Sequence, residues 1–249
     1  MTQNSPSEYT QVPQGMSPFP AAEDVFAPDQ LELAAHLHPL FSLDIATLNP
    51  DWSGVLHMLS PLEPYEGFVG QHTEQTGLHG DLLKTNWIGF TLENGRYRLC
   101  GDPRYFFLHR DNGALHTQFP ELTAELQQHY AEQHQSYAAT AEAYRASGTL
   151  RRLETYIRDP EPEAFVSQLG GDADGGDNWV QSVPFPKEVI SVDGSRRSPS
   201  TVYPLSPAGR RFLHVASVPG WHYRTQGADM IVMFYEPVEG LVLFTFDFS

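Results

Sequence analysis

A chain of 249 residues with 40% hydrophobic residues is long enough to bury a core, and its net charge of −16 disfavours nucleic acid and anionic lipid as partners. Its single cysteine, Cys100, excludes an internal disulfide framework and cysteine-only zinc or iron–sulfur sites, and it is typical of a reducing compartment. The N-terminal stretch lacks the basic and apolar regions of a secretion signal, and the longest apolar run, at residues 230–235, is too short to cross a bilayer. We therefore expect a cytoplasmic protein with no nucleic-acid or membrane partner.

The charges are distributed unevenly along the chain. No lysine or arginine precedes Lys84, whereas this stretch of 83 residues carries 11 acidic side chains. Such a surface attracts basic proteins and raises their association rates, although the acidity could also serve solubility alone. The acidic residues that we select as candidate partner contacts are Glu63, Glu66, Glu74 and Asp81.

The N-terminal quarter is predicted to be poorly structured. Residues 1–28 are rich in proline and serine and lack periodicity, which predicts a flexible tail. A short helix is expected over residues 29–38, capped by Asp29 and stopped by Pro39. The prolines between Pro39 and Pro64 then predict loops and short turns.

An antiparallel meander is the clearest local prediction. Residues 86–92 and 96–100 are expected to pair as a hairpin, because Asn94 and Gly95 both tolerate the positive φ of a tight turn. The turn residues that follow this hairpin predict two more strands, at residues 104–110 and 114–117.

A long helix is predicted over residues 120–147. Pro120 suits a first helical turn and Gly148 suits a C-terminal cap. Apolar residues recur at helical spacing, so the helix is amphipathic, and the preceding meander is its expected packing partner. The predicted stripe contains Leu122, Leu126, Tyr130, Tyr137, Ala141 and Tyr144.

The remaining chain is predicted to be mostly β. A short helix at residues 164–169 and an irregular stretch at residues 183–207 are expected before three strands at residues 212–218, 230–235 and 241–248. The fold class is therefore α+β, with antiparallel sheets and a long amphipathic helix after a β-meander. The predicted parts are the tail at 1–28, an α+β half at 29–157 and a mostly β half at 158–249, and the two halves could also form one compact domain.

Several residues invite a search for catalytic chemistry. Asp172, Asp174 and Asp177 form an acidic loop that could surround a hard cation, but a complete calcium loop requires an acid where Val183 stands. We therefore favour a flexible acidic turn and expect no metal or other cofactor. Pairing of Cys100 with His109 or His116 is possible across the meander, but a buried cysteine that acts as a small apolar residue is favoured.

Histidine pairs and tryptophans complete the candidate residues. The pairs His36 with His38, and His129 with His134, lack a third ligand at suitable spacing, which favours structural or surface roles. Trp179 and Trp221 lie in segments rich in glycine, proline and histidine, where a partly exposed aromatic ring would anchor a partner. Core burial is nevertheless the favoured interpretation for both rings, because tryptophan is highly buried on average, and both residues are kept as candidate partner contacts.

Two stretches resemble known bacterial families. The segment from Trp87 to Gly148, a meander followed by a helix, looks like the end of SUKH domains. The C-terminal third resembles the YwqG-like family in residues 169–171, 178–179, 184–186, 212–217 and 233–237. The resemblance implies an immunity-type protein that neutralises a basic toxin by binding it, and it supplies no catalytic residues.

The sequence therefore predicts a non-enzymatic bacterial binding protein with a basic protein partner. The alternative is a metal-dependent hydrolase, or another enzyme whose site the sequence does not reveal.

Overall fold

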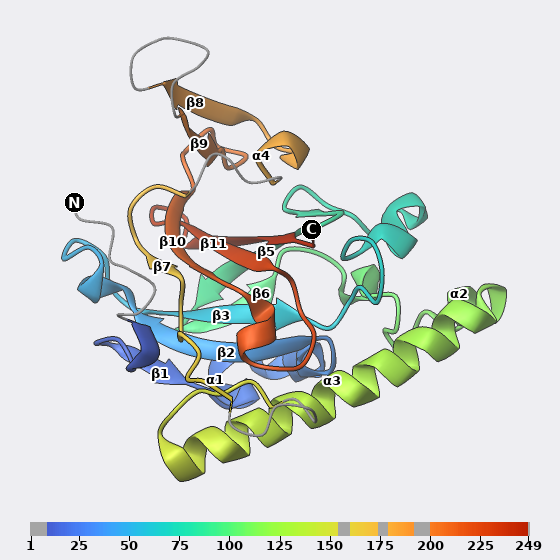
Figure 1. Ribbon diagram of the computed structural model, residues 1–249. Coiled ribbons are helices and arrows are strands. Elements are labelled where there is room, and N and C mark those ends of the chain that lie inside the picture. The colour runs from blue at the N-terminus through green and yellow to red at the C-terminus, as the bar shows by residue number, and fades with distance from the viewer. Residues whose placement is uncertain (1–8, 154–159, 174–178, 192–199, 249) are drawn as a thin grey trace.

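The computed structural model describes residues 9–153, 160–173, 179–191 and 200–248. It is a mixed α+β structure of antiparallel sheets and a long helix, which confirms the predicted fold class. Figure 1 shows a layered arrangement in which a smaller sheet lies between a larger sheet and the long helix α3. The smaller sheet contains β1 (Met16–Pro18), β2 (Leu37–Asp44) and β3 (Val55–Pro61).

The larger sheet is assembled from distant parts of the chain. Its strands follow the order β4-β5-β12-β11-β10-β7, and β6 pairs with β5. Strand β12 pairs antiparallel with β5, so that strands from both predicted halves share one sheet. The bounds are β4 (Leu83–Lys84), β5 (Trp87–Glu93), β6 (Arg96–Leu99), β7 (Gln168–Leu169), β10 (Leu213–Val218), β11 (Met230–Glu236) and β12 (Leu241–Asp247).

The predicted hairpin and the three C-terminal strands are confirmed. Asn94 and Gly95 turn between β5 and β6 with φ values of 53° and 78°. Strand β12 is buried on both faces: Phe244 joins the core shared with the smaller sheet, and Leu243 joins an apolar cluster on the opposite face. Trp179 belongs to that second cluster, which explains why its ring is buried.

The N-terminal quarter is folded from residue 9, so the predicted tail is wrong over the described residues. Met16 pairs with Leu43 of β2, and the fully buried Phe26 bridges to Tyr97. Apolar residues within a Pro-rich stretch thus reach partners that are distant in sequence. Short helices in this quarter are α1 (Ala22–Val25) and the 3₁₀ helix η2 (Pro28–Ala35), which replaces the helix expected at 29–38.

The loops predicted between Pro39 and Pro64 are also wrong, because β2 and β3 occupy this region. Pro39 stands where the β2–β3 register shifts, and Pro61 is the last residue of β3. A proline is tolerated at both kinds of position because the ladder requires no N–H donor there. These two strands pair directly and carry much of the inner core.

Helix α3 (Pro120–Ser147) has the predicted bounds. It ends at Gly148, which has a left-handed φ of 69° and donates its N–H to Tyr144 O at 2.7 Å. Its partner differs from the predicted one, because α3 contacts residues 36–39, 61–63 and 224–226. The helix therefore lies along one end of the smaller sheet.

The other elements are short and include several corrections. Residues 104–110 and 114–117 form no strands, and the 164–169 segment contains β7 instead of the predicted helix. Residues 183–207, predicted to be irregular, contain the antiparallel pair of β8 and β9. This pair projects from the body in Figure 1. Segment 164–169 extends because Ser167 N–H pairs with Ser217 O on β10, which makes β7 the edge strand of the larger sheet. The bounds are η3 (Ile45–Thr47), η4 (Gln71–Thr76), η5 (Pro103–Tyr105), α2 (Gly113–Gln118), α4 (Trp179–Ser182), β8 (Lys187–Ser191), β9 (Ser200–Pro204) and η6 (Gly220–His222).

Candidate functional site

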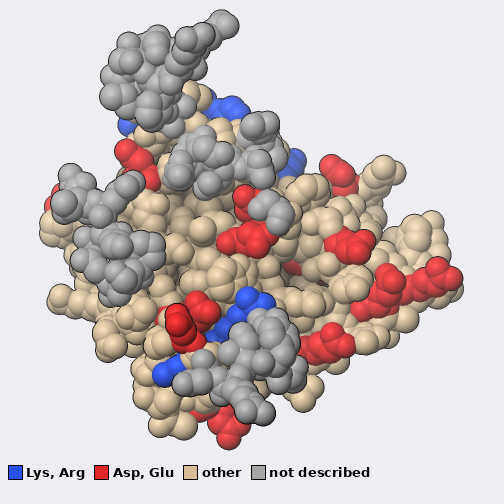
Figure 2. All heavy atoms as spheres, in the orientation of Figure 1, with Lys and Arg blue, Asp and Glu red and all other residues tan. Residues whose placement is uncertain are grey.

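A cavity of about 420 Å³ lies between η4 and the junction of α2 with α3. The described residues that line it include no lysine or arginine. Exposed Glu121 and Glu125 lie on the neighbouring turns of α3, and Figure 2 shows red but no blue atoms at this end of the helix. The lining residues are Gln71, His72, Glu74, Gln75, Thr76, Leu115, Gln118, Phe119 and Leu122.

A tight loop before η4 presents two aromatic rings to solvent. The side chain of Gln71 closes this loop: its Oε1 accepts from Phe68 N at 3.0 Å and its Nε2 donates to Glu66 O at 2.9 Å. Gly67 has a φ of 91°, and a Cβ there would fall 2.3 Å from Gln71 Oε1, so glycine is required. Tyr65 and Phe68 are thereby held 53% and 50% exposed.

Behind the cavity, the ring of Phe107 lies between two histidines. Its centroid is 5.6 Å from that of His72 and 5.4 Å from that of His116. His116 Nε2 donates to Phe107 O at 2.8 Å. Burial lowers the pKa of His72, which favours the neutral ring at neutral pH. On the η4 side of the cavity, the His72 ring therefore adds no positive charge at neutral pH.

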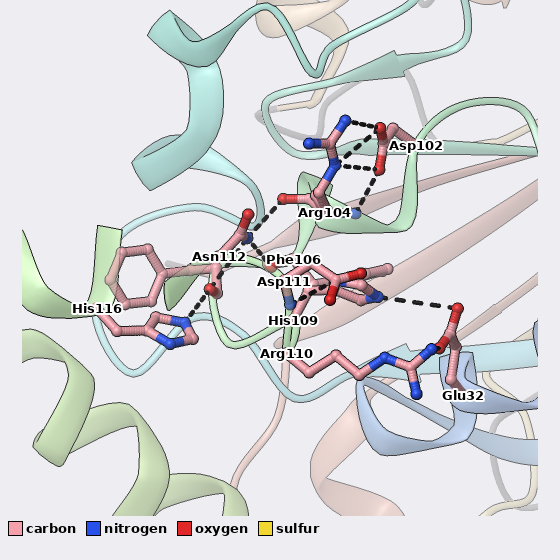
Figure 3. Close-up of polar contacts among 10 residues, drawn as sticks. Glu32, Asp102, Arg104, Phe106, His109, Arg110, Asp111, Asn112 and His116 are labelled. Carbon is pink, nitrogen blue, oxygen red and sulfur yellow. Dashed lines mark hydrogen bonds and ion pairs between the residues drawn. The ribbon is translucent and has the colours of Figure 1, made fainter. Parts of the chain in front are cut away.

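Asn112 organises the segment that carries Phe107, as Figure 3 shows. Its Nδ2 donates to the carbonyl oxygens of Arg104 and Phe106 at 2.9 Å and contacts that of Phe107 at 3.2 Å. One amide thus gathers three carbonyls from a span of four residues and curls the backbone around itself. This is the physical reason that residues 104–110 do not extend into the predicted strand.

The basic residues of the same segment are neutralised by acids, also visible in Figure 3. The Arg104 guanidinium binds the Asp102 carboxylate, with Nε 3.0 Å from Oδ1. Arg110 Nη2 lies 2.9 Å from Glu32 Oε2. Because both guanidinium groups are already paired, neither neutralises the acidic residues of the cavity.

Glu63 is buried behind the cavity, which corrects its predicted role as a surface contact. The side chain is 1% exposed, and its Oε1 accepts from Phe107 N at 2.6 Å and from the Tyr130 hydroxyl at 3.2 Å. Burial raises the pKa of Glu63 to about 7, against the opposing effect of these donors. The carboxyl group therefore connects the Phe107 segment to α3 and is not accessible to a partner.

A seam of histidines joins α3 to the smaller sheet. His134 Nδ1 lies 2.8 Å from His38 Nε2, and His38 Nδ1 lies 3.1 Å from Nη1 of Arg224. His129 Nε2 donates to Leu62 O at 2.9 Å, and His36 Nδ1 lies 3.3 Å from the Tyr130 hydroxyl. We call these four histidines with Arg224 the histidine seam. Sequence spacing alone did not reveal it, because its members come from three distant segments.

The remaining predicted contacts are scattered. Glu74 lines the cavity and Glu66 is exposed beside it, whereas Asp81 lines a separate cavity of about 380 Å³ with Lys84. The guanidinium of Arg152 lies over the half-buried ring of Trp221, 5.2 Å from its centroid.

Trp179 is 1% exposed, which confirms the favoured core burial and contradicts its alternative role as an exposed partner contact. It packs against Phe234 of β11 and Trp87 of β5 on the outer face of the larger sheet.

The candidate chemical groups do not converge on a catalytic or metal centre in the described chain. Asp172 accepts a hydrogen bond from the Tyr203 hydroxyl at 2.6 Å, while Asp174 and Asp177 lie outside the described residues. Among the described residues, no group of three or more His, Cys, Asp or Glu side chains has a geometry that could hold a metal ion. Burial raises the pKa of Cys100 to about 12, which opposes a reactive thiolate.

Comparison with protein-family models, with curated proteins and with solved structures finds no match to this chain. Within its described residues, none of the helices combines the length and the apolar composition needed to traverse a bilayer. Function is therefore inferred from the residues and their geometry.

Proposed function

We propose that this protein is a non-enzymatic binding protein that holds a basic polypeptide segment on the surface around the cavity. We define this cavity surface as residues 65–76 and 115–125. The observation that carries the proposal is the combination of exposed aromatic rings with uncompensated carboxylates around one cavity. Phe119, 43% exposed, lines the cavity with Glu74, and the loop that leads into η4 carries exposed Glu66 between Tyr65 and Phe68, which are 53% and 50% exposed.

Aromatic rings and carboxylates together suit a basic segment better than an acidic or a purely apolar one. A lysine or arginine gains both from the negative face of an aromatic ring and from a nearby carboxylate. The aliphatic stem of the same side chain packs on apolar groups such as Leu115 and Leu122. Because the carboxylates are exposed, added salt should weaken the complex.

The charge of the whole chain supports the same partner class. The net charge of −16 steers basic proteins toward the surface, and residues 63–83 contribute acids without any lysine or arginine. The resemblance to YwqG-like and SUKH proteins makes a basic toxin the first natural partner to test, with this protein acting as its immunity-type inhibitor.

The defining experiment titrates the protein with a short synthetic peptide of alternating lysine and leucine, followed by backbone amide NMR. We expect shifts concentrated in residues 65–76 and 115–125, and binding that weakens as salt rises. Glu74→Gln should reduce affinity by about 3- to 10-fold, corresponding to the loss of one partly exposed charge contact.

Glu142→Gln is the matched control, because this exposed glutamate lies near the opposite end of α3. It makes the net charge less negative by the same amount but should leave the affinity nearly unchanged. Equal losses in the two variants, or shifts spread over the whole acidic surface, would show nonspecific attraction and contradict the proposed site. A peptide with glutamate in place of lysine should not bind.

A further inference from the structure

Helix α3 is fastened to the body through polar side chains as well as through aromatic contacts of Tyr137 and Tyr144. Within α3, all of which is described, the buried residues are Leu126, His129, Tyr130, Gln133, Thr140 and Ala141, so half of them are polar types. Gln133 Oε1 accepts from Gln226 N at 3.2 Å and Ser136 Oγ accepts from Thr225 N at 2.7 Å. Hydrogen bonds depend on protonation in a way that apolar contacts do not.

The central connection is a chain of hydrogen bonds from Arg224 through His38 to His134. Its donors and acceptors match only when both histidines are neutral. The Arg224 guanidinium can only donate, so His38 Nδ1 must be the acceptor in their 3.1 Å contact. The proton of neutral His38 is then on Nε2, which donates to His134 Nδ1 at 2.8 Å. A second proton on His38 would face the Arg224 donor, and one on His134 Nδ1 would face the His38 donor. Protonation of either ring thus breaks a hydrogen bond.

Arg224 makes the relay sensitive to added positive charge. Its side chain is 2% exposed, and it also donates to Gln226 O at 2.6 Å and to Pro61 O. Among the ion pairs between described residues, none includes Arg224. An imidazolium formed beside this guanidinium is therefore repelled in a buried environment, where charges interact strongly.

A second connection lies one to two turns closer to the cavity. His129 donates to Leu62 O through Nε2, while its Nδ1 is buried without a hydrogen-bond acceptor among the described residues. A proton on that nitrogen would be an unsatisfied buried donor. Nearby, His36 and Glu63 both contact the Tyr130 hydroxyl, and the ring of His36 stacks on Phe106 at 4.8 Å.

We propose that acid releases helix α3 from the smaller sheet, because protons on the histidine seam break its hydrogen bonds and place new cations beside Arg224. The released helix carries Phe119 and Leu122 out of the cavity wall. This consequence for partner binding rests on the proposed function, whereas the release itself does not. The titratable or charged groups that face the seam are His36, His38, Glu63, His109, His129, Tyr130, Glu132, His134, Tyr137, Arg145 and Arg224.

The direction of the effect follows from proton linkage. Burial lowers the pKa of His36 to about 3 and lowers the pKa values of His38, His129 and His134 as well. The attached state therefore binds fewer protons than the released state, whose histidines regain a pKa near about 6.5. The stabilising contribution is fully present above that pH and is lost as the pH falls. Each histidine favours release by up to about tenfold per unit of pH below that value.

Glu63 does not offset this charge in acid. Its pKa is raised to about 7, so a falling pH converts its carboxylate to the neutral acid while the histidines gain charge. A further carboxylate near the seam, that of Glu132, is on the exposed side of α3.

The test is hydrogen exchange of the whole chain, read by mass spectrometry from about pH 7.5 to about pH 5 and corrected for the intrinsic exchange rate. We expect peptides covering residues 126–141 to lose more than about tenfold in protection, while those of β12 change less than about twofold. The double variant His38→Gln and His134→Gln keeps a donor and an acceptor at each site but cannot take up a proton. In it, α3 should keep its protection at a lower pH than in the unmodified protein.

His214→Gln is the matched control. His214 is also buried with a pKa lowered to about 4 by burial, but it bonds to Gly170 O and Ser217 Oγ on the larger sheet. It should leave the acid response of α3 unchanged. Should the double variant fold poorly, His134→Gln alone, at a partly exposed position, supplies the same comparison.

Simultaneous loss of protection in α3 and β12, or an unchanged acid response in the glutamine variants, would overturn the proposed release. Exchange requires no partner, so this failure is distinct from failure of the proposed function. Absent binding of the lysine–leucine peptide at neutral pH would contradict the partner proposal and leave the release of α3 unaffected.

Discussion

The larger sheet and most of the histidine seam are buried, with His134 the exposed member of the seam, but they are held together by different forces. In β12, Val242, Phe244 and Phe246 pack into the shared core through apolar contacts. In the seam, His38 and Arg224 meet through hydrogen bonds that specify which atom carries a proton. Burial of apolar area is non-directional and independent of pH, whereas the seam depends on protonation. The sheet therefore supplies most of the stability, whereas the attachment of α3 supplies the sensitivity to pH.

The largest effect is expected in the sheet. Phe244 is fully buried, and its ring lies 5.9 Å from that of Phe90 and 6.2 Å from that of Tyr97. Phe244→Ala should lower the free energy of unfolding by about 3–5 kcal/mol, through lost apolar contact and the cavity that remains. The loss should be similar at about pH 7.5 and about pH 5.5, since no titrating group is removed. Urea denaturation at both pH values measures it.

The control for the sheet is Val238→Ala, in the turn between β11 and β12. Val238 is 72% exposed, so the change in unfolding free energy should stay within about 0.5 kcal/mol. A strongly pH-dependent loss in Phe244→Ala would contradict the assignment of pH sensitivity to the seam.

A smaller effect is expected from the cation of the seam. Arg224→Met keeps most of the side-chain volume but leaves the carbonyls of Pro61 and Gln226 without their donor. We expect a loss of about 2–3 kcal/mol at neutral pH, mainly from the unsatisfied acceptor at buried Pro61. The loss should shrink in acid, because His38 then takes up a proton without a neighbouring guanidinium.

Arg211→Met provides the comparison for Arg224. Arg211 forms an exposed ion pair with Glu188, with Nε 2.6 Å from Oε2, so its removal should have little effect at either pH. A loss in Arg224→Met that grows as the pH falls would contradict the repulsion assigned to this residue.

Local signals in the sequence were sufficient for the elements that local chemistry specifies. Asn94 and Gly95 define the hairpin by their backbone freedom, and Pro120 and Gly148 define the ends of α3. The same approach failed where long-range contacts decide. Pro39 was interpreted as the stop of a short helix and the start of a stretch of loops, but it occupies the register shift of β2, where the sheet tolerates it.

The candidate site shows the same division. Of the acidic residues selected by charge counting, Glu66 and Glu74 are exposed, whereas Glu63, three positions before Glu66, is buried by contacts to Phe107 and Tyr130. Neither partner is near it in the sequence. The seam was missed for the same reason, since His38 and Arg224 are separated by 186 positions.

The smallest and most specific effect concerns Glu63, which connects the seam to the segment behind the cavity. Its pKa is raised to about 7 from an ordinary value near 4.5, so the folded state binds more protons at this site than the unfolded state between these values. The contribution to stability is therefore fully present below about pH 4.5 and is lost as the pH rises through about 7. In Glu63→Gln this dependence disappears. The difference in unfolding free energy between the unmodified protein and the variant should fall by up to about 2 kcal/mol between about pH 5.5 and about pH 7.5. The opposing histidines are present in both proteins, so their contribution cancels in the difference. A constant offset with pH would mean that Glu63 is already ionised at about pH 5.5, and the seam would then contain a carboxylate able to balance the charge of Arg224.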